Sequence, residues 1–163
     1  MSQKATLAGE ARTAIRESAR RFPKGRQRSA VLDALRQAQE DNAGWLSVEL
    51  MDAVAEELQM PPIQVYEVAT FYSMFEVRPV GRNCVSVCTN ISCWLRGGEE
   101  LLAHLENRLG ISVGESTADG RIFLKKEEEC LAACTGAPMM MVNHRYHEHV
   151  TPDQANRIVE GLD

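Results

Sequence analysis

Residues 84–98 read CVSVCTNISCWLRGG and mark an abrupt change of texture along the chain. The stretch opens with a short β-branched run up to Cys88, which predicts a β-strand. It ends on two glycines, and residues 99–109 then place leucines at helical spacing behind two glutamates, which predicts a helix. A strand that passes through a loop into a helix is typical of an α/β domain.

The rest of the C-terminal half continues this pattern. Further strands are predicted at 122–124, at 138–142 and at 145–147. A last helix is predicted behind Thr151, because proline follows at the first helical position and a glutamine completes a capping box. The predicted order is β-α-β-β-β-α, a sheet of about four strands with two helices.

The N-terminal half reads as helices. Apolar residues at helical spacing predict a helix over 26–41, and Ser47 is expected to cap the next one. Pro61-Pro62 can open another helix, which is expected to include Phe75. The fold class is therefore predicted as α/β, with a helical domain over residues 1–79 followed by an α/β domain over residues 80–163.

The charge of the chain is uneven. The net charge is −5, which argues against a nucleic-acid partner. Residues 1–28 nevertheless carry eight Lys and Arg against two glutamates. A solvated helix face is the preferred interpretation of this segment, and a mobile basic arm over 1–20 is the alternative. No apolar run approaches the ~20 residues that a bilayer needs, and the N-terminus lacks the apolar core of a signal peptide. We therefore expect a bacterial cytoplasmic protein, or the mature form of a processed one, that does not insert into the membrane.

Four of the five cysteines form two pairs. The spacing is Cys88-x4-Cys93, then 36 residues, then Cys130-x3-Cys134. Each pair lies where a predicted strand runs into a loop, and two loops at one end of a sheet can bring four thiolates together. Such a set completes the coordination of a [2Fe–2S] cluster, two thiolates on each iron. The fifth cysteine, Cys84, is expected to be a small buried side chain.

Other chemistries stay open on the residues alone. An odd cysteine count without a secretion signal argues against a disulfide framework. Structural zinc, which would make the protein an interaction module without a redox role, more often uses a Cys-x2-Cys knuckle. A dithiol redox site is weaker still, because the sequence has no Cys-x2-Cys. Unliganded core cysteines are the remaining alternative, and iron–sulfur binding is the preferred interpretation.

Several motifs resemble the thioredoxin-like [2Fe–2S] ferredoxin family. They are residues 87–97, VCTNISCWLRG, residues 129–134, ECLAAC, and residues 137–139, APM. Upstream, residues 42–46, NAGWL, and 66–72, YEVATFY, are similar to the helical domain of the same family. The resemblance runs from about residue 20 to the C-terminus. One departure is Ala132, where the family commonly has glycine.

The resemblance implies a fold and a function. It implies a thioredoxin-like domain with one [2Fe–2S] cluster on Cys88, Cys93, Cys130 and Cys134. It also implies that the chain is a one-electron carrier in a respiratory NADH:quinone oxidoreductase, beside the subunit that binds FMN and NADH and with further peripheral-arm subunits. Soluble NAD-linked formate dehydrogenases and hydrogenases use similar small subunits and are the alternative host. The chain has no Gly-x-Gly-x-x-Gly motif or phosphate loop, so it is not expected to catalyse alone.

Two weaker signals accompany this site. His144, His147 and His149 are expected to lie in an exposed hairpin, with metal binding the less favoured interpretation. Trp94 follows a ligand cysteine and is expected either to pack or to shield the cluster from water. Neither signal changes the prediction of an iron–sulfur electron carrier.

Overall fold

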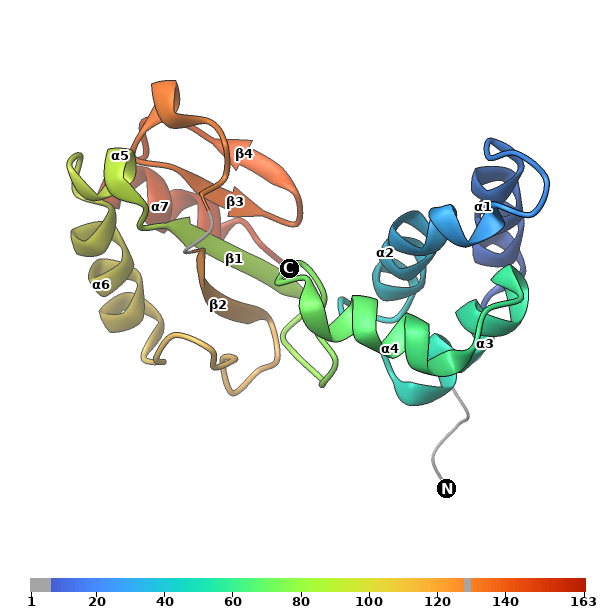
Figure 1. Cartoon of the computed structure of the whole chain (residues 1–163). Helices are drawn as coiled ribbons and strands as arrows, with labels where there is room; N and C mark the ends of the chain where they lie inside the picture. Colours follow the sequence, from blue (N-terminus) through green and yellow to red (C-terminus); the bar gives the residue numbers. More distant parts are fainter. Residues whose placement is uncertain (1–6, 128–129) are drawn as a thin grey trace. The chain divides into compact units, whose positions relative to one another are not determined.

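The computed structural model describes residues 7–127 and 130–163, and Figure 1 shows their helices and strands. The chain divides into two compact units, one ending at Pro79 and the other beginning at Val80. The first is helical and the second is a mixed sheet with helices, which confirms the predicted fold class. Among the described residues, no helix has the length and apolar character needed to cross a membrane.

The N-terminal unit is a cluster of helices around one core. Its elements are α1 (Gly9–Arg20), the 3-10 helix η1 (Gln27–Ala30), α2 (Val31–Asp41), α3 (Val48–Leu58) and α4 (Pro62–Phe71). Each α-helix contributes almost wholly buried side chains, among them Ile15, Leu35, Val54 and Val65. Burying one such side chain contributes roughly 1.5–3 kcal/mol, so this shared core stabilises the unit more than helix propensity does.

The basic N-terminal segment is helical over the length of α1. Ile15 lies in the core, while Arg16 on the same helix donates to the carboxylate of Glu57 at 2.8 Å. The alternative of a mobile basic arm over residues 1–20 is therefore wrong for α1, because an apolar stripe anchors that helix. Residues 1–6 lie outside the described part of the chain.

The helix predicted to include Phe75 is shorter than expected. Helix α4 ends at Phe71, and the chain then turns. The amide of Gln39 explains the turn, because its nitrogen donates to the carbonyl of Met74 at 3.0 Å and its oxygen accepts from the N–H of Glu76 at 2.7 Å. A continuing helix would use these main-chain groups internally. Phe75 is buried in the core, but it lies outside the helix that was expected to include it.

Two other helix predictions in this unit are confirmed. The hydroxyl of Ser47 caps α3 by accepting a hydrogen bond from the N–H of Leu50 at 3.2 Å. The helix predicted over 26–41 is present, but its first turn is the 3-10 helix η1 and α2 follows directly. Tightening into 3-10 geometry is common at helix ends.

The C-terminal unit has the predicted order of strands and helices. Its elements are β1 (Asn83–Cys88), α5 (Ile91–Trp94), α6 (Gly98–Leu109), β2 (Ile122–Glu127), the 3-10 helix η2 (Cys134–Gly136), β3 (Met140–Val142), β4 (Arg145–His147) and α7 (Pro152–Glu160). The capping box at Thr151 is present. The short helix α5 was not predicted, and strand β3 starts at Met140 because Pro138 has no N–H for the sheet.

The sheet has the strand order β2-β1-β3-β4, with β1 and β2 parallel and the other pairs antiparallel. Val85 and Val87 of β1 face a core that α6 and α7 cover, where Leu105 and Ala155 are fully buried. Alternation along the strand turns Cys88 to the other face, into a smaller apolar cluster. Both helices therefore pack on one face of the sheet, and the Cys88 side chain points to the opposite face.

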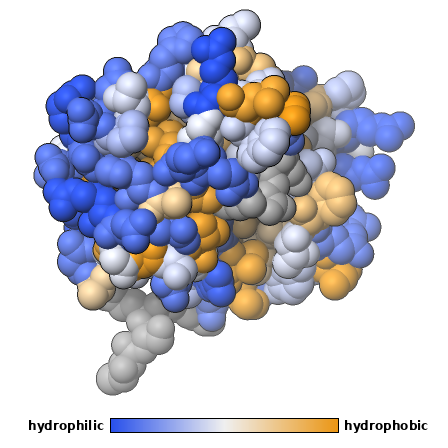
Figure 2. All heavy atoms as spheres, turned by 90° about the vertical axis from the view of Figure 1, so that its left-hand side faces the viewer, coloured by the Kyte–Doolittle hydropathy of each residue, from blue (hydrophilic) through white to orange (hydrophobic). Residues whose placement is uncertain are grey.

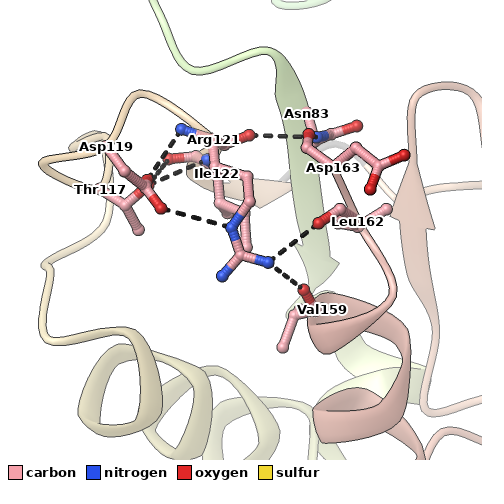
Figure 3. Close-up of polar contacts among 8 residues, drawn as sticks. All are labelled: Asn83, Thr117, Asp119, Arg121, Ile122, Val159, Leu162 and Asp163. Atoms are coloured by element: carbon pink, nitrogen blue, oxygen red, sulfur yellow. Dashed lines mark hydrogen bonds and ion pairs between the residues drawn. The ribbon is translucent and has the colours of Figure 1, made fainter.

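Hydrogen bonds join the starts of β1 and β2 to the C-terminal end of the chain around the end of α7, as Figure 3 shows. Arg121 donates to the carbonyl oxygens of Val159 at 3.0 Å and Leu162 at 2.9 Å, and it lies next to Asp119. Asn83 donates to the main-chain oxygen of Asp163 at 2.8 Å. The bond to Val159 satisfies a carbonyl that the end of α7 leaves open. Together the bonds hold the C-terminal end of the chain against the starts of β1 and β2, at the opposite end of these strands from the two cysteine pairs.

Candidate iron–sulfur site

Parallel pairing of β1 and β2 brings the two cysteine loops to one edge of the sheet. Cys88 ends β1 opposite Glu127, the last residue of β2. From β1 the chain continues into α5, which carries Cys93, and after β2 it continues to Cys130 and then to Cys134 at the start of η2. Carboxyl ends of parallel strands share an edge, so two segments far apart in sequence converge there.

Cys88 and Cys93 form a buried pair. Their side chains are 1% and 2% exposed and hydrogen-bond to each other, and the backbone N–H of Met139 donates to the Cys93 sulfur. Burial, and then the hydrogen bond with Cys88, raise the pKa of the Cys93 thiol to about 11. A thiolate in so dry a position needs a positive partner beside it, which a metal ion supplies.

Cys130 and Cys134 form a second, more accessible pair. Their sulfurs are 3.6 Å apart, with Cys130 half-buried and Cys134 exposed. The N–H of Ala132 donates to the Cys130 sulfur at 3.3 Å. Cys130 and Ala132 have φ angles of +68° and +57°, both left-handed. That backbone region favours glycine, which is a physical reason for the family's glycine where this chain has Ala132.

The two pairs adjoin but remain distinct. Cys130 is among the charges that raise the pKa of Cys93, so the pairs lie close enough to interact. Within the described residues, however, no three His, Cys, Asp or Glu side chains meet closely enough to hold one ion. In the first pair the Cys93 sulfur accepts a hydrogen bond from the N–H of Met139, and in the second the Cys130 sulfur accepts one from the N–H of Ala132. The donor set of four sulfurs in two pairs fits a centre with two irons.

A glycine lets α6 approach the first cysteine loop. A Cβ at Gly98 would lie 2.7 Å from the carbonyl oxygen of Cys88 and 2.9 Å from that of Cys93. Both contacts are with backbone, which could not move aside without moving the cysteines. The preceding Gly97 has φ +87° and caps α6. The glycine pair at the end of the opening motif therefore serves to pack the site.

The helix α5 presents apolar side chains next to the site. Ile91, Trp94 and Leu95 are 62%, 54% and 71% exposed. Figure 2, which views the molecule from the side where α5 and α6 are drawn in Figure 1, shows hydrophobic surface among predominantly hydrophilic residues. The expectation that Trp94 packs is wrong, because α5 is a single turn that holds Cys93 inward and turns Trp94 outward.

Two features of the site were missed from the sequence. Helix α5 is capped by Asn90, whose side-chain oxygen accepts from the N–H of Ile91 at 2.8 Å. An asparagine before a short apolar run could have indicated this helix. The N–H groups of Ala132 and Met139 carry no such signal, because main-chain donors are present at nearly every residue.

The remaining candidates lie apart from the two pairs. Cys84 is half-buried, with its sulfur 3.8 Å from the Ser86 hydroxyl, so the expectation of a fully buried position is wrong. It sits near the start of β1, on the face that neither α6 nor α7 covers. His147 lies in β4 of the predicted hairpin, and burial followed by the charge of Arg145 lowers its pKa. His149 follows the strand with φ +51°, so it does not continue the strand face of His147.

Comparison with known proteins identifies relatives over nearly the whole chain. Residues 15–163 match the model of the family described as thioredoxin-like [2Fe-2S] ferredoxin. The E subunit of NADH-quinone oxidoreductase from Rickettsia bellii is 43% identical over 143 residues, covering 88% of this chain and 85% of that protein. Mitochondrial NADH dehydrogenase [ubiquinone] flavoprotein 2 of Dictyostelium discoideum is 44% identical over 142 residues, covering 87% of this chain and 57% of that protein.

A solved structure shares the fold. A chain of an NAD+-reducing [NiFe]-hydrogenase in its H2-reduced state superimposes with a TM-score of 0.69 at 24% identity, covering 80% of this chain. This chain spans only 21% of the length of that hydrogenase chain, so the likeness supports the fold alone. The family match over residues 15–163 and the identity to the E-type relatives agree with each other. The chain therefore belongs to the thioredoxin-like [2Fe–2S] ferredoxin family, in the group of NADH-quinone oxidoreductase E subunits.

Proposed function

We propose that this chain is the E-type subunit of a respiratory NADH:quinone oxidoreductase and binds one [2Fe–2S] cluster through Cys88, Cys93, Cys130 and Cys134. The observation that carries the proposal is the convergence of two cysteine pairs at the shared edge of β1 and β2. The relatedness to E subunits at 43% identity supports the choice of complex. When bound, the cluster supplies a one-electron acceptor.

The pairing of the cysteines favours this cluster over zinc. A structural zinc needs four ligands at about 2.3 Å around one point. A [2Fe–2S] cluster instead needs two thiolates on each of two irons. The contact of Cys88 with Cys93, and that of Cys130 with Cys134, supports two thiolates for each iron. An arrangement in two pairs therefore suits a two-iron centre better than a single ion.

The two cysteine pairs differ in their access to solvent, so the site has a dry side, where the cysteines are buried, and an open side, where a cysteine is exposed. Leu131 and Met139, which are 6% and 1% exposed, pack with Cys88 and Cys93 and exclude water from them. Cys134 is exposed on the other side. We infer that the open side, with the apolar residues of α5 beside it, faces the F-type subunit of the complex, the partner that binds FMN and NADH. This proposal places the chain at the cytoplasmic side of the bacterial inner membrane, attached through the complex.

We further propose a division of labour between the two parts of the chain, with residues 80–163 as the ferredoxin domain and residues 1–79 as a docking domain. All four proposed ligand cysteines and the sheet lie in the C-terminal unit. In the helical part, Phe71 is 78% exposed and Tyr72 is 39% exposed, and their rings meet edge to face. Tyr66, a third aromatic residue and a further candidate contact, is only partly exposed, because it also packs on the core.

A chain that begins near residue 80 tests this division. It is expected to bind the cluster, because the sheet and both cysteine loops are intact, but to bind the flavin-bearing partner more weakly than the full chain. Absorption spectroscopy and a binding titration measure the two properties. Partner binding at full affinity would contradict the docking role of residues 1–79, and failure to hold the cluster would contradict the domain assignment.

Purification from native membranes tests the proposed function. The full chain, isolated by a tag under conditions that preserve complexes, is expected to be red-brown and to copurify with an FMN-containing, NADH-oxidising subunit and membrane subunits of the same complex. Copurification with a formate dehydrogenase or hydrogenase would identify the alternative host. A colourless preparation that contains zinc and no iron would reject the electron-carrier function itself.

A further inference from the structure

The loop between Cys130 and Cys134 aims one main-chain donor at the cluster site. The N–H of Ala132 points to the Cys130 sulfur at 3.3 Å, and the loop does this with left-handed φ angles at Cys130 and Ala132. Neither residue is a glycine or an asparagine, the types that adopt this region readily. The Ala132 N–H is therefore presented by a left-handed backbone conformation that residues with a Cβ atom disfavour.

A hydrogen bond to a ligand sulfur acts on the redox chemistry of the site. Reduction adds an electron, and hence negative charge, to the thiolates and sulfides around the irons. A donated N–H stabilises that added charge and so raises the reduction potential, which is one of the levers that proteins use on iron–sulfur clusters. Of the sulfurs of Cys130 and Cys134, the structure gives a main-chain donor to that of Cys130.

We propose that Ala132 is a positioning residue whose left-handed backbone holds its N–H on the Cys130 sulfur and thereby sets the reduction potential of the cluster. This inference rests on the proposed function, because it requires the cluster on this cysteine pair. It assigns a role to the main chain of Ala132 and none to its methyl group, which is exposed. The neighbouring Ala133, with φ −126°, has no such role and offers a matched control.

Three substitutions in the full chain separate these positions. In Ala132→Val the β-branched side chain disfavours the left-handed region, so the N–H leaves the sulfur and the potential falls. At the wild-type midpoint we expect about a tenfold drop in the ratio of reduced to oxidised cluster, a shift of about 59 mV for a one-electron couple. Ala132→Gly keeps both the N–H and the φ angle and is expected to stay within about twofold of the wild-type ratio. Ala133→Gly is expected to do the same, because Ala133 is not left-handed (φ −126°) and glycine adds no bulk where this residue packs beside the cysteines.

Electron paramagnetic resonance during a redox titration measures these ratios. A cluster-loaded Ala132→Val chain with the wild-type potential would overturn the proposal, as would an equal shift in Ala133→Gly. A wild-type chain without a cluster would instead be a failure of the proposed function.

Pulsed electron paramagnetic resonance gives a second measurement that does not need Ala132→Val to hold its cluster. With 15N-alanine incorporated, the reduced full chain is expected to show a 15N coupling from the Ala132 amide. The coupling should disappear in Ala132→Gly, whose amide is then unlabelled, and should persist in Ala133→Gly. A spectrum that is the same in wild type and Ala132→Gly would show that this amide does not reach the cluster and would reject the proposal.

Discussion

Serine in place of Cys88, Cys93, Cys130 or Cys134 is expected to reduce bound iron and acid-labile sulfide from about two atoms of each per chain to a small fraction of that. Serine keeps the size of the side chain but replaces the soft thiolate that the cluster requires. The loss should be most complete at Cys88 and Cys93, because the apolar residues around them exclude the water that could otherwise replace a missing ligand. Iron and sulfide assays on the purified variants measure the effect.

Cys84→Ser is the matched control for this series. Cys84 lies on the same strand and the same face as Cys88, but its neighbour is the Ser86 hydroxyl at 3.8 Å. A serine there has a polar neighbour already, so the variant is expected to hold the full complement of iron. Full cluster retention in Cys130→Ser, or complete loss in Cys84→Ser, would overturn the assignment of the four ligands.

Features of the fold that depend on interactions between residues close together in the sequence could be predicted from the sequence. The cap at Ser47 and the capping box at Thr151 are confirmed, since each is decided by hydrogen bonds within four residues. The glycine at position 110 ends α6 with φ +67°, also a local property. The strand order along the chain followed from alternation and turn residues for the same reason.

Features set by distant contacts were not predictable in this way. Helix α4 ends early because Gln39, more than thirty residues upstream, takes the main-chain groups of Met74 and Glu76. The exposure of Cys84 depends on which elements cover that face of the sheet, and spacing along one strand does not specify this. The ligand pairs could be proposed from spacing, but the N–H donors of Ala132 and Met139 could not, because they depend on loop conformation.

The isolated chain, loaded with its cluster, is expected not to be reduced by NADH, although dithionite should reduce it fully. NADH delivers a hydride, which carries two electrons together, and a [2Fe–2S] cluster accepts one. A flavin separates the two electrons, and the chain has no sequence motif for a flavin or a dinucleotide. The exposed side of the site at Cys134 nevertheless leaves room for a small reductant or a partner to approach.

When the flavin-bearing partner is added to the chain and NADH, the cluster is therefore expected to become reduced and to give its paramagnetic signal. Anaerobic mixing followed by electron paramagnetic resonance decides the matter, with the dithionite-reduced chain as the reference for full reduction. Cys88→Ser with the same partner is the control, because it should give no such signal even though the flavin is reduced. A strong signal from the wild-type chain with NADH alone would mean that the chain has a hydride-accepting site of its own. Reduction by dithionite but not by NADH with the partner would place the cluster outside electron-transfer reach of the flavin, and would reject the proposed partner while leaving the cluster assignment intact.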